Sequence, residues 1–344
     1  MCSNILLQFE PRQVHAPEIG LEWLNSPPLT MRGLRGRAVL IDFWDYTCVN
    51  CIRTLPYVRE WHRRYHTKGL AVIGVHAPEF FFAQTAENVA KAAEEFHLDY
   101  PILLDNDYQV WKAFANRYWP AKYLIDKDGY LRYFHAGEGN YEETEQMIQG
   151  LLREIDPAVE LPPVLEPVRA LDRSGVLEAC ERPTPELYLG YQRGHIVNPD
   201  GFIKDQIASY QFGTQPPADG PELAGPWFSG AQFVAVAAHP TDGEPARLRL
   251  PYSAAEINLV MAPGTNPFPS RAEITDDGRP LDHQSRGEDV REQADGGTWI
   301  EISRPRMYSL VKRDRFLSRE LRLASRSTGL QLFAFTFVSC VPRP

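Results

Sequence analysis

Residues 38–56 read Ala-Val-Leu-Ile-Asp-Phe-Trp-Asp-Tyr-Thr-Cys-Val-Asn-Cys-Ile-Arg-Thr-Leu-Pro, and this stretch decides the fold of the first half of the chain. Its first seven residues are almost all apolar and rich in strand formers, which predicts a strand that is buried on both faces. After a short turn, apolar residues recur at helical spacing as far as Tyr65. Cys48 and Cys51 therefore stand where a helix begins, directly after a buried strand.

The position of Cys48 at a helix start favours its ionised form. The first helical turn carries free backbone N–H groups and the positive end of the helix dipole, and both stabilise an anion. We therefore expect Cys48 to be the attacking thiolate, with Thr47 as the N-cap residue. Cys51 lies one turn deeper on the same face, where it can resolve a mixed disulfide formed at Cys48. A dithiol of this kind needs no cofactor and no metal.

One carboxylate interrupts the predicted buried strand. Asp42 lies on the strand that leads into the cysteine-bearing helix. Burial of a carboxylate is costly and raises its pKa, so a buried Asp42 suits a proton relay for Cys51. The alternative is that Asp42 is a core residue paired with a lysine or an arginine.

Two histidines after the cysteines leave a zinc site as an alternative. With His62 and His66 the spacing is Cys-x2-Cys-x10-His-x3-His, about two residues shorter than in the usual zinc finger. Because the cysteines open a helix and Pro56 interrupts the interval, redox-active thiols are the favoured interpretation. A purely structural disulfide between the two cysteines is the other alternative.

This block resembles the thioredoxin superfamily, and the matching residues have the same offsets from the first cysteine: Asp42, Phe43, Trp44, Cys48, Cys51 and Pro56. A second match is Trp119-Pro120-Ala121, where that family places a cis-proline facing the disulfide. The first domain is most similar to TlpA-like thiol–disulfide oxidoreductases, in particular to the soluble C-terminal region of DipZ-type proteins. The resemblance implies a thioredoxin-like α/β fold, a central mixed sheet flanked by helices.

The candidate site follows from these residues and from the resemblance. The predicted catalytic residues are Cys48, Cys51, Asp42 and Pro120, and the predicted substrate-groove residues are Trp44, Thr47, Trp119 and His76. His76 is included because it ends the next predicted strand, and the carboxyl ends of parallel strands face the ligand crevice. It has the alternative role of an ordinary structural histidine.

Length, net charge and composition argue against several classes of protein. The chain has 344 residues and a net charge of −9, with 43% hydrophobic residues. This length predicts two domains, and the charge argues against a nucleic-acid partner. No apolar run approaches a membrane span. The N-terminus lacks the features of a signal peptide, and five cysteines, an odd number, argue against a disulfide framework, so a cytoplasmic location is expected.

A proline-rich stretch predicts the domain boundary. Residues 157–173 are expected to be a stiff linker between a redox domain at 1–156 and a second domain at 174–344. The second domain alternates short strand-like runs with turn signals, which predicts an all-β sandwich of the jelly-roll type. The predicted strands are 232–238, 246–250, 257–261, 299–303, 308–313, 320–324 and 331–338.

The second domain is also similar to DipZ-type proteins, in which this region has the fold of a carbohydrate-binding module. The similar stretches are 184–190, 257–260, 307–311 and 333–337. The resemblance raises a glycan as a partner, with Trp227, Tyr252 or Trp299 as the stacking surface. The favoured alternative is that the domain shapes the thiol site or docks a protein. Cys180 and Cys340 are expected to be free, buried thiols.

The favoured function is thiol–disulfide exchange with protein disulfides through the CxxC dithiol, coupled to an upstream thiol electron donor or acceptor. One rival is a thiol peroxidase of the peroxiredoxin type, although Thr47 directly before Cys48 does not fit the spacing of that chemistry. The other rival is a glycan-binding or scaffold protein in which the thioredoxin-like domain is incidental. The direction of electron flow does not follow from Val49 and Asn50 between the cysteines.

Overall fold

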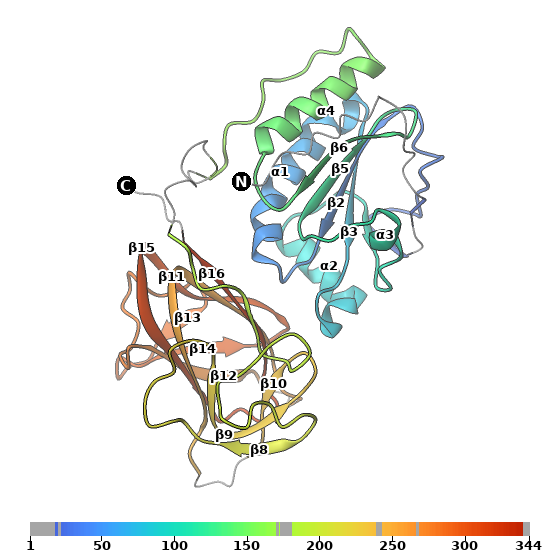
Figure 1. The fold of residues 1–344 in the computed structure, drawn as a ribbon. Coiled ribbons are helices and arrows are strands. Elements are labelled where there is room, and N and C mark those ends of the chain that lie inside the picture. Colours follow the sequence, from blue (N-terminus) through green and yellow to red (C-terminus); the bar gives the residue numbers. More distant parts are fainter. Residues whose placement is uncertain are drawn as a thin grey trace. The chain divides into compact units, whose positions relative to one another are not determined.

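The computed structural model describes residues 18–19, 22–169, 172, 181–238, 243–265 and 268–339 (Figure 1). The chain divides into two compact units, Met1–Asp172 and Arg173–Pro344. The predicted boundaries at 156 and 173 stay predictions. Cys180 and Cys340, which the sequence predicts to be free thiols, lie outside the described residues.

The first unit is built on a six-stranded mixed sheet in the order β1-β4-β3-β2-β5-β6. The central strand β2 is parallel to β3 and antiparallel to β5, and every residue of β2 and β3 is buried. The strands are Glu22–Leu24 (β1), Ala38–Trp44 (β2), Leu70–His76 (β3), Ile102–Leu104 (β4), Ala121–Ile125 (β5) and Leu131–Ala136 (β6). This sheet, with its helices, confirms the predicted thioredoxin-like fold.

Two long helices, α1 and α4, lie side by side on one face of this sheet (Figure 1). The rings of Tyr57 and Tyr141 stack between them with centroids 3.6 Å apart. The opposite face of the sheet packs against apolar residues that include Val110 and Phe114. The helices are Val49–Tyr65 (α1), Ala86–Glu95 (α2), Gln109–Ala113 (α3) and Tyr141–Ile155 (α4), with 3-10 turns at His66–Lys68 and Phe81–Gln84.

The predicted linker is folded against these two helices. The Gln149 side chain donates a hydrogen bond to the Pro162 carbonyl at 2.8 Å. The Glu145 carboxylate accepts one from the Leu165 N–H at 2.9 Å. We call residues 161–169 the strap, because side chains of α1 and α4 bind its backbone at several points. The proline-rich strap is therefore packed against α1 and α4 and is not a free linker.

The second unit is a ten-stranded sheet in the order β13-β14-β12-β15-β11-β16-β10-β9-β8, with β7 beside β16. All its strand pairings are antiparallel. The strands are Leu187–Tyr188 (β7), Ile207–Tyr210 (β8), Glu222–Ser229 (β9), Val234–Val236 (β10), Ala246–Ala262 (β11), Ser270–Asp276 (β12), Val290–Glu292 (β13), Thr298–Ile302 (β14), Arg306–Ser325 (β15) and Gln331–Val338 (β16). An all-β second domain is confirmed, and the jelly-roll type stays a prediction.

Two pairs of predicted strands are in fact two long strands. The runs 246–250 and 257–261 belong to β11, and the runs 308–313 and 320–324 belong to β15. The β11–β15 register shifts between Ala254 and Glu256. Such bulges break the two-residue period within a continuous strand, so the pattern suggests separate strands.

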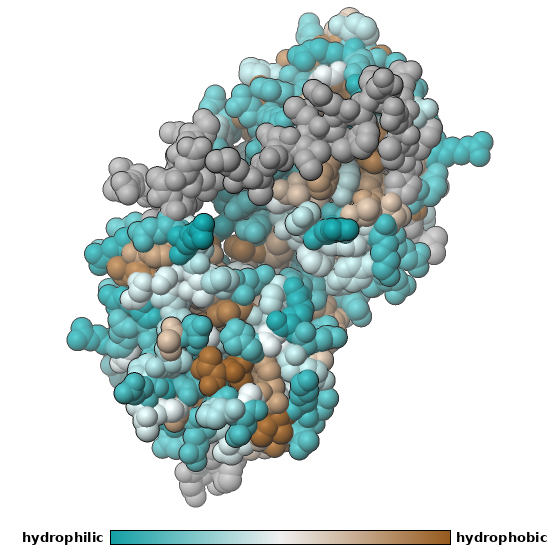
Figure 2. Space-filling model, in the orientation of Figure 1, coloured by the Kyte–Doolittle hydropathy of each residue, from teal (hydrophilic) through white to brown (hydrophobic). Residues whose placement is uncertain are grey.

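The visible surface is mostly hydrophilic, with small, separate apolar areas (Figure 2). The most exposed large apolar side chains include Phe268, Ile207 and Tyr118, which are 74%, 66% and 54% exposed. Among the described helices none has the length and apolar character to span a bilayer.

Candidate active site

The two thiols lie at the start of α1 at different depths. Cys48 is half-buried and Cys51 is fully buried, and both are free cysteines. Cys48 is itself the N-cap residue of α1, because its Sγ accepts a hydrogen bond from the Cys51 N–H at 3.2 Å. Cys48 is therefore the thiol that a substrate can reach, and its sulfur already interacts with a helix-start N–H group.

The prediction that Thr47 is the N-cap is wrong. The Thr47 side chain is buried and donates its hydroxyl hydrogen bond to Asp45. The same Asp45 carboxylate accepts hydrogen bonds from the backbone N–H groups of Thr47, at 2.6 Å, and of Glu79, at 2.8 Å. Asp45 thus ties the cysteine turn to the loop after β3, a role that the sequence analysis missed.

Asp42 is a buried carboxyl without a hydrogen-bond partner. Its side chain points from β2 into the interior, and no described residue bonds to either of its oxygens. Burial raises the pKa of Asp42 to about 7, and the positive charge of Lys122 acts in the opposite direction. No hydrogen bond joins Asp42 to a lysine or an arginine of the described residues, but Lys122 is close enough to lower the pKa of Asp42, so the proton-relay role and the alternative of a charge-paired core residue both stay predictions.

Cys51 is placed where it needs a proton acceptor. Burial raises the pKa of the Cys51 thiol well above its ordinary value, and the hydrogen bond and charge of Cys48 and the charge of Asp42 add to this. Buried thiols attack disulfides only after losing their proton. Burial raises the pKa of Asp42 to about 7, and Asp42 stays the predicted acceptor of this proton.

A buried lysine near this pair was missed by the sequence analysis. Lys122 lies opposite Asp42 in the β2–β5 register, and its side chain is fully buried. Burial lowers the pKa of Lys122 to about 8, although Asp42, Cys51 and Glu138 raise it. The available signal was a lysine beside the apolar run 123–125, but its partner depends on strand register.

The peptide bond between Trp119 and Pro120 is cis, as the resemblance implies. The Pro120 carbonyl accepts a hydrogen bond from the Gly137 N–H at 2.8 Å. Trp119 is half-buried, and its Nε1 donates to the Ala77 carbonyl at 3.0 Å. The cis-proline loop is thus fixed to the loops after β3 and β6.

Two of the predicted groove residues are fully buried. Trp44 and His76 have no exposed surface, and their rings meet edge to face with centroids 5.1 Å apart. Burial lowers the pKa of His76 to about 3, so the ring is neutral at pH 7. With the buried Thr47, they are corrected from groove residues to residues of the supporting wall, since no substrate chain reaches a fully buried side chain. Trp119 keeps an exposed part.

The zinc alternative receives no support from the described residues. His62 of α1 and His66 of the following 3-10 turn stack with ring centroids 5.1 Å apart, and the His66 ring forms a hydrogen bond with the His62 carbonyl. In the described ranges no group of three or more His, Cys, Asp or Glu side chains is arranged to hold a metal ion.

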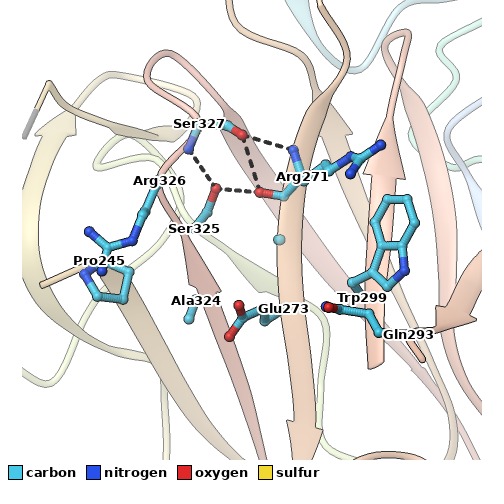
Figure 3. A pocket seen from close by; sticks show the side chains of 10 residues that line it. Pro245, Arg271, Glu273, Gln293, Trp299, Ala324, Ser325, Arg326 and Ser327 are labelled. Carbon is cyan, nitrogen blue, oxygen red and sulfur yellow. Dashed lines mark hydrogen bonds between the residues drawn. The ribbon is translucent and has the colours of Figure 1, made fainter. Parts of the chain in front are cut away.

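The aromatic residues proposed for glycan stacking differ in exposure. Trp227 and Tyr252 are 2% and 3% exposed, so both are core residues and are wrong as stacking surfaces. Trp299 is half-buried and lines a cavity of about 480 Å³ on the second unit (Figure 3). Figure 3 shows Gln293 beside Trp299 and the Glu273 carboxylate directed toward Ala324, and the Arg271 guanidinium lies 4.3 Å from the Trp299 ring centroid.

Two protein families match the two units. The AhpC/TSA family matches residues 13–134, and the family described as a thioredoxin like C-terminal domain matches residues 184–337. Thiol-disulfide oxidoreductase YkuV of Bacillus subtilis is 31% identical over 134 residues, which are 39% of this chain and 90% of that protein. Thiol-disulfide oxidoreductase ResA of Geobacillus thermodenitrificans is 30% identical over 136 residues, 40% of this chain and 75% of that protein. The chain belongs to the thioredoxin-like thiol–disulfide oxidoreductase family.

Both units are similar to a single longer relative. Protein DipZ of Mycobacterium tuberculosis is 36% identical over 327 residues, which are 92% of this chain and 41% of that protein. The chain thus spans less than half the length of this curated relative. The predicted resemblance to DipZ-type proteins is confirmed over both units.

Proposed function

We propose that this protein exchanges thiols with protein disulfides through Cys48 and Cys51. The observation that carries the proposal is the half-buried Cys48 sulfur at the start of α1, with the fully buried Cys51 and the unpartnered Asp42 carboxyl behind it. This arrangement supplies one thiol that a substrate reaches, one that resolves, and one proton acceptor.

The reduction of a substrate disulfide proceeds in two displacements. The Cys48 thiolate attacks one substrate sulfur, forms a mixed disulfide and releases the other substrate sulfur as a thiolate. Asp42 then accepts the Cys51 proton, and Cys51 attacks Cys48 Sγ. This step forms the Cys48–Cys51 disulfide and releases the second substrate thiolate, so two electrons pass from the protein to the substrate. Oxidation of a substrate dithiol runs through the same steps in reverse.

The proposal implies protein partners and no external cofactor. The Pro120 side chain is buried, so substrate chains would lie against the backbone of the cis-proline loop and the exposed part of Trp119. A second thiol protein would restore the dithiol or the disulfide after each cycle. The electrons are carried by the two sulfurs, so the reaction needs no bound cofactor or metal.

The first test is a Cys48→Ser variant assayed for insulin disulfide reduction. Loss of activity is expected, whereas Cys51→Ser is expected to accumulate a mixed disulfide with the substrate. Full activity in Cys48→Ser contradicts the proposal. A peroxide assay with a thiol reductant separates the peroxidase rival, which predicts faster consumption of peroxide than of protein disulfide.

The reduction potential of the pair decides the direction of electron flow. A value near about −270 mV marks a reductant and agrees with the expected cytoplasmic location, whereas about −120 mV marks an oxidant that works outside the cytoplasm. The potential is measured against glutathione by thiol trapping. Cys51→Ser, which lacks one thiol of the pair, is the negative control.

A second, separate activity is glycan binding at the Trp299 cavity. One observation favours it: an aromatic ring, the Glu273 carboxylate and the Gln293 amide line one hollow of about 480 Å³. Aromatic faces stack on sugars while neighbouring polar groups accept and donate hydrogen bonds. The test is titration with chitohexaose and cellohexaose. Binding that is lost in Trp299→Ala supports the activity, and unchanged binding, or none in the wild type, removes it.

A further inference from the structure

A second cavity of the second unit, which we call the arginine cavity, has no part in the exchange steps above. Its volume is about 230 Å³, and it shares no lining residue with the Trp299 cavity. One wall is the loop after β12, and the other is the middle of β15. The Lys312 N–H of β15 donates a hydrogen bond to the Ser285 carbonyl of this loop at 3.1 Å, which holds the two walls together. The arginines that line the cavity are Arg279, Arg313, Arg315 and Arg319.

An irregularity of β15 brings two of these arginines to the cavity. At the register shift between Ala254 and Glu256, β11 advances by two residues while β15 advances by five. The extra residues of β15 form a large bulge at 313–316. Bulges change the direction of side chains and are frequent beside functional sites. This one places Arg313 and Arg315 at the same hollow.

Arg313 is a buried guanidinium with donors to spare. The residue is 7% exposed. Its Nη1 donates a hydrogen bond to the Tyr252 hydroxyl at 2.7 Å, and its Nη2 donates one to Asp276. A guanidinium has five N–H groups, so three of those of Arg313 have no acceptor among the described residues. These N–H groups are left for a ligand in the cavity.

One buried carboxylate holds two of the guanidinium groups. Asp276 is 4% exposed, and one of its oxygens accepts hydrogen bonds from Arg313 and, at 3.2 Å, from Arg319. Its other oxygen accepts the Tyr252 hydroxyl at 2.7 Å. Arg319 also lies 3.6 Å from Asp277, but that carboxylate is half-exposed and water screens the pair. Asp276 therefore fixes the positions of two positive charges and neutralises one.

The other charged groups of the cavity leave it with a positive excess. Arg279 and Arg315 are exposed, and neither side chain is paired with a carboxylate among the described residues. Asp282 accepts the Ser285 hydroxyl at 2.6 Å within its own turn, and Asp314 is exposed. Four arginines against three aspartates give the lining a formal charge of +1, whereas the whole chain has −9.

We propose that the arginine cavity binds a phosphorylated sugar. Guanidinium groups match phosphate oxygens bidentately, and arginine clusters are a common way to recognise a phosphate group. The free N–H groups of Arg313 bind the phosphate at the buried end, and Arg279 and Arg315 bind it from the rim. Asp282 and Asp314 accept hydrogen bonds from sugar hydroxyls. This activity goes beyond the proposed function and needs neither thiol.

The experiment is isothermal titration calorimetry of the full chain with glucose 6-phosphate, inorganic phosphate and glucose. Glucose 6-phosphate is expected to bind about tenfold more tightly than inorganic phosphate, because phosphate and hydroxyl contacts act together. Sodium chloride should weaken both by screening the rim charges. The absence of binding by either phosphate compound up to about 10 mM overturns the inference. Equal affinity for the two compounds overturns the sugar and leaves free phosphate as the ligand.

Variants at the rim test the location of the site. Arg315→Ala is expected to weaken the binding of glucose 6-phosphate by about tenfold. Arg313 is left intact, because its loss would also unpair the buried Asp276. Arg182→Ala, at an exposed arginine outside the cavity, is the matched control and should keep the wild-type affinity. Wild-type affinity in Arg315→Ala, or an equal loss in Arg182→Ala, overturns the inference. Because the readout is binding, the result does not depend on thiol exchange.

Discussion

Asp42 links the chemistry of the thiols to the stability of the fold. Its pKa is about 7 in the folded protein, because of burial, and its ordinary value is 3.8. Between these two values the folded state binds a proton that the unfolded state does not bind. The contribution of Asp42 to stability is therefore fully present below pH 3.8 and is lost as the pH rises to about 7.

The Asp42→Asn variant should remove this dependence. Asn is neutral at every pH, so we expect it to match the wild type near pH 3 and to exceed it by about 4 kcal/mol at pH 8. Urea unfolding of the reduced proteins, followed by tryptophan fluorescence, measures the difference. Asp107→Asn, at an exposed carboxyl, is the control for the replacement of a carboxyl by an amide. A constant difference between wild type and Asp42→Asn would count against a raised pKa at Asp42.

Asp45 is a second buried carboxylate, and unlike Asp42 it accepts several hydrogen bonds. Its carboxylate accepts hydrogen bonds from two backbone N–H groups and one hydroxyl, all at the cysteine turn and the loop after β3. Asp45→Ala leaves these donors without an acceptor, which should cost about 2–3 kcal/mol of stability and slow disulfide exchange. Urea unfolding and the insulin assay measure the two effects. Asp107→Ala is the matched control, and equal behaviour of both variants would show that the Asp45 bonds do not hold the turn.

The sequence predicted those site residues that are recognised by their residue type and by short intervals along the chain. Cys48, Cys51 and Asp42 stand at fixed short intervals, and Pro120 was found through the resemblance. Asp45 and Lys122 were missed because their partners come from distant strands and loops. The groove role assigned to Trp44 and His76 was wrong, although the predicted buried strand included Trp44 and a structural role was left open for His76.

At the scale of elements, the strap shows how α1 and α4 are fastened. Glu145 is buried on α4 and accepts hydrogen bonds from Trp61, Arg64 and Tyr65 of α1. Its carboxylate also accepts the Leu165 N–H of the strap. One carboxylate thus joins three segments that are far apart in the chain.

Glu145→Ala in the full chain should destabilise the packing of α1, α4 and the strap. The loss of a buried, multiply bonded acceptor is expected to cost about 3–5 kcal/mol, because Arg64 is left without its buried partner. Hydrogen exchange of the strap amides should rise at the same time. Glu142→Ala, at an exposed position of α4, is the control. Unchanged exchange at Leu165 would mean that the strap does not depend on Glu145.

Neither the packing surface of the strap nor the continuity of the long strands could be predicted from the sequence. Four prolines at 157–173 indicate a stiff segment but give no information about the surface on which it lies. In β11 the period of two is broken at the Ala254–Glu256 register shift, so a continuous strand looks like two. The predicted bounds of β16, 331–338, agree with the structure, although the β11–β16 register also shifts, between Val260 and Met261.

At the scale of the whole molecule, each unit has a core of its own. One apolar cluster, which includes Ile41, Phe43 and Tyr123, lies within the first sheet and its helices. Another, which includes Leu250, Ile257 and Leu259, lies within the second unit. The redox residues all belong to the first unit, so a change at the thiols should act on the stability of that unit.

This separation predicts two transitions in calorimetry of the full chain. Leu259→Ala removes a fully buried side chain from the second core and should cost about 2–5 kcal/mol, which lowers one transition only. Asp42→Asn at pH 8 should raise the other transition only, since the carboxyl is buried within the first unit. A single transition whose midpoint is shifted by both substitutions would show that the two cores unfold as one cooperative unit. A substitution at Cys48 would then change the stability of the whole chain.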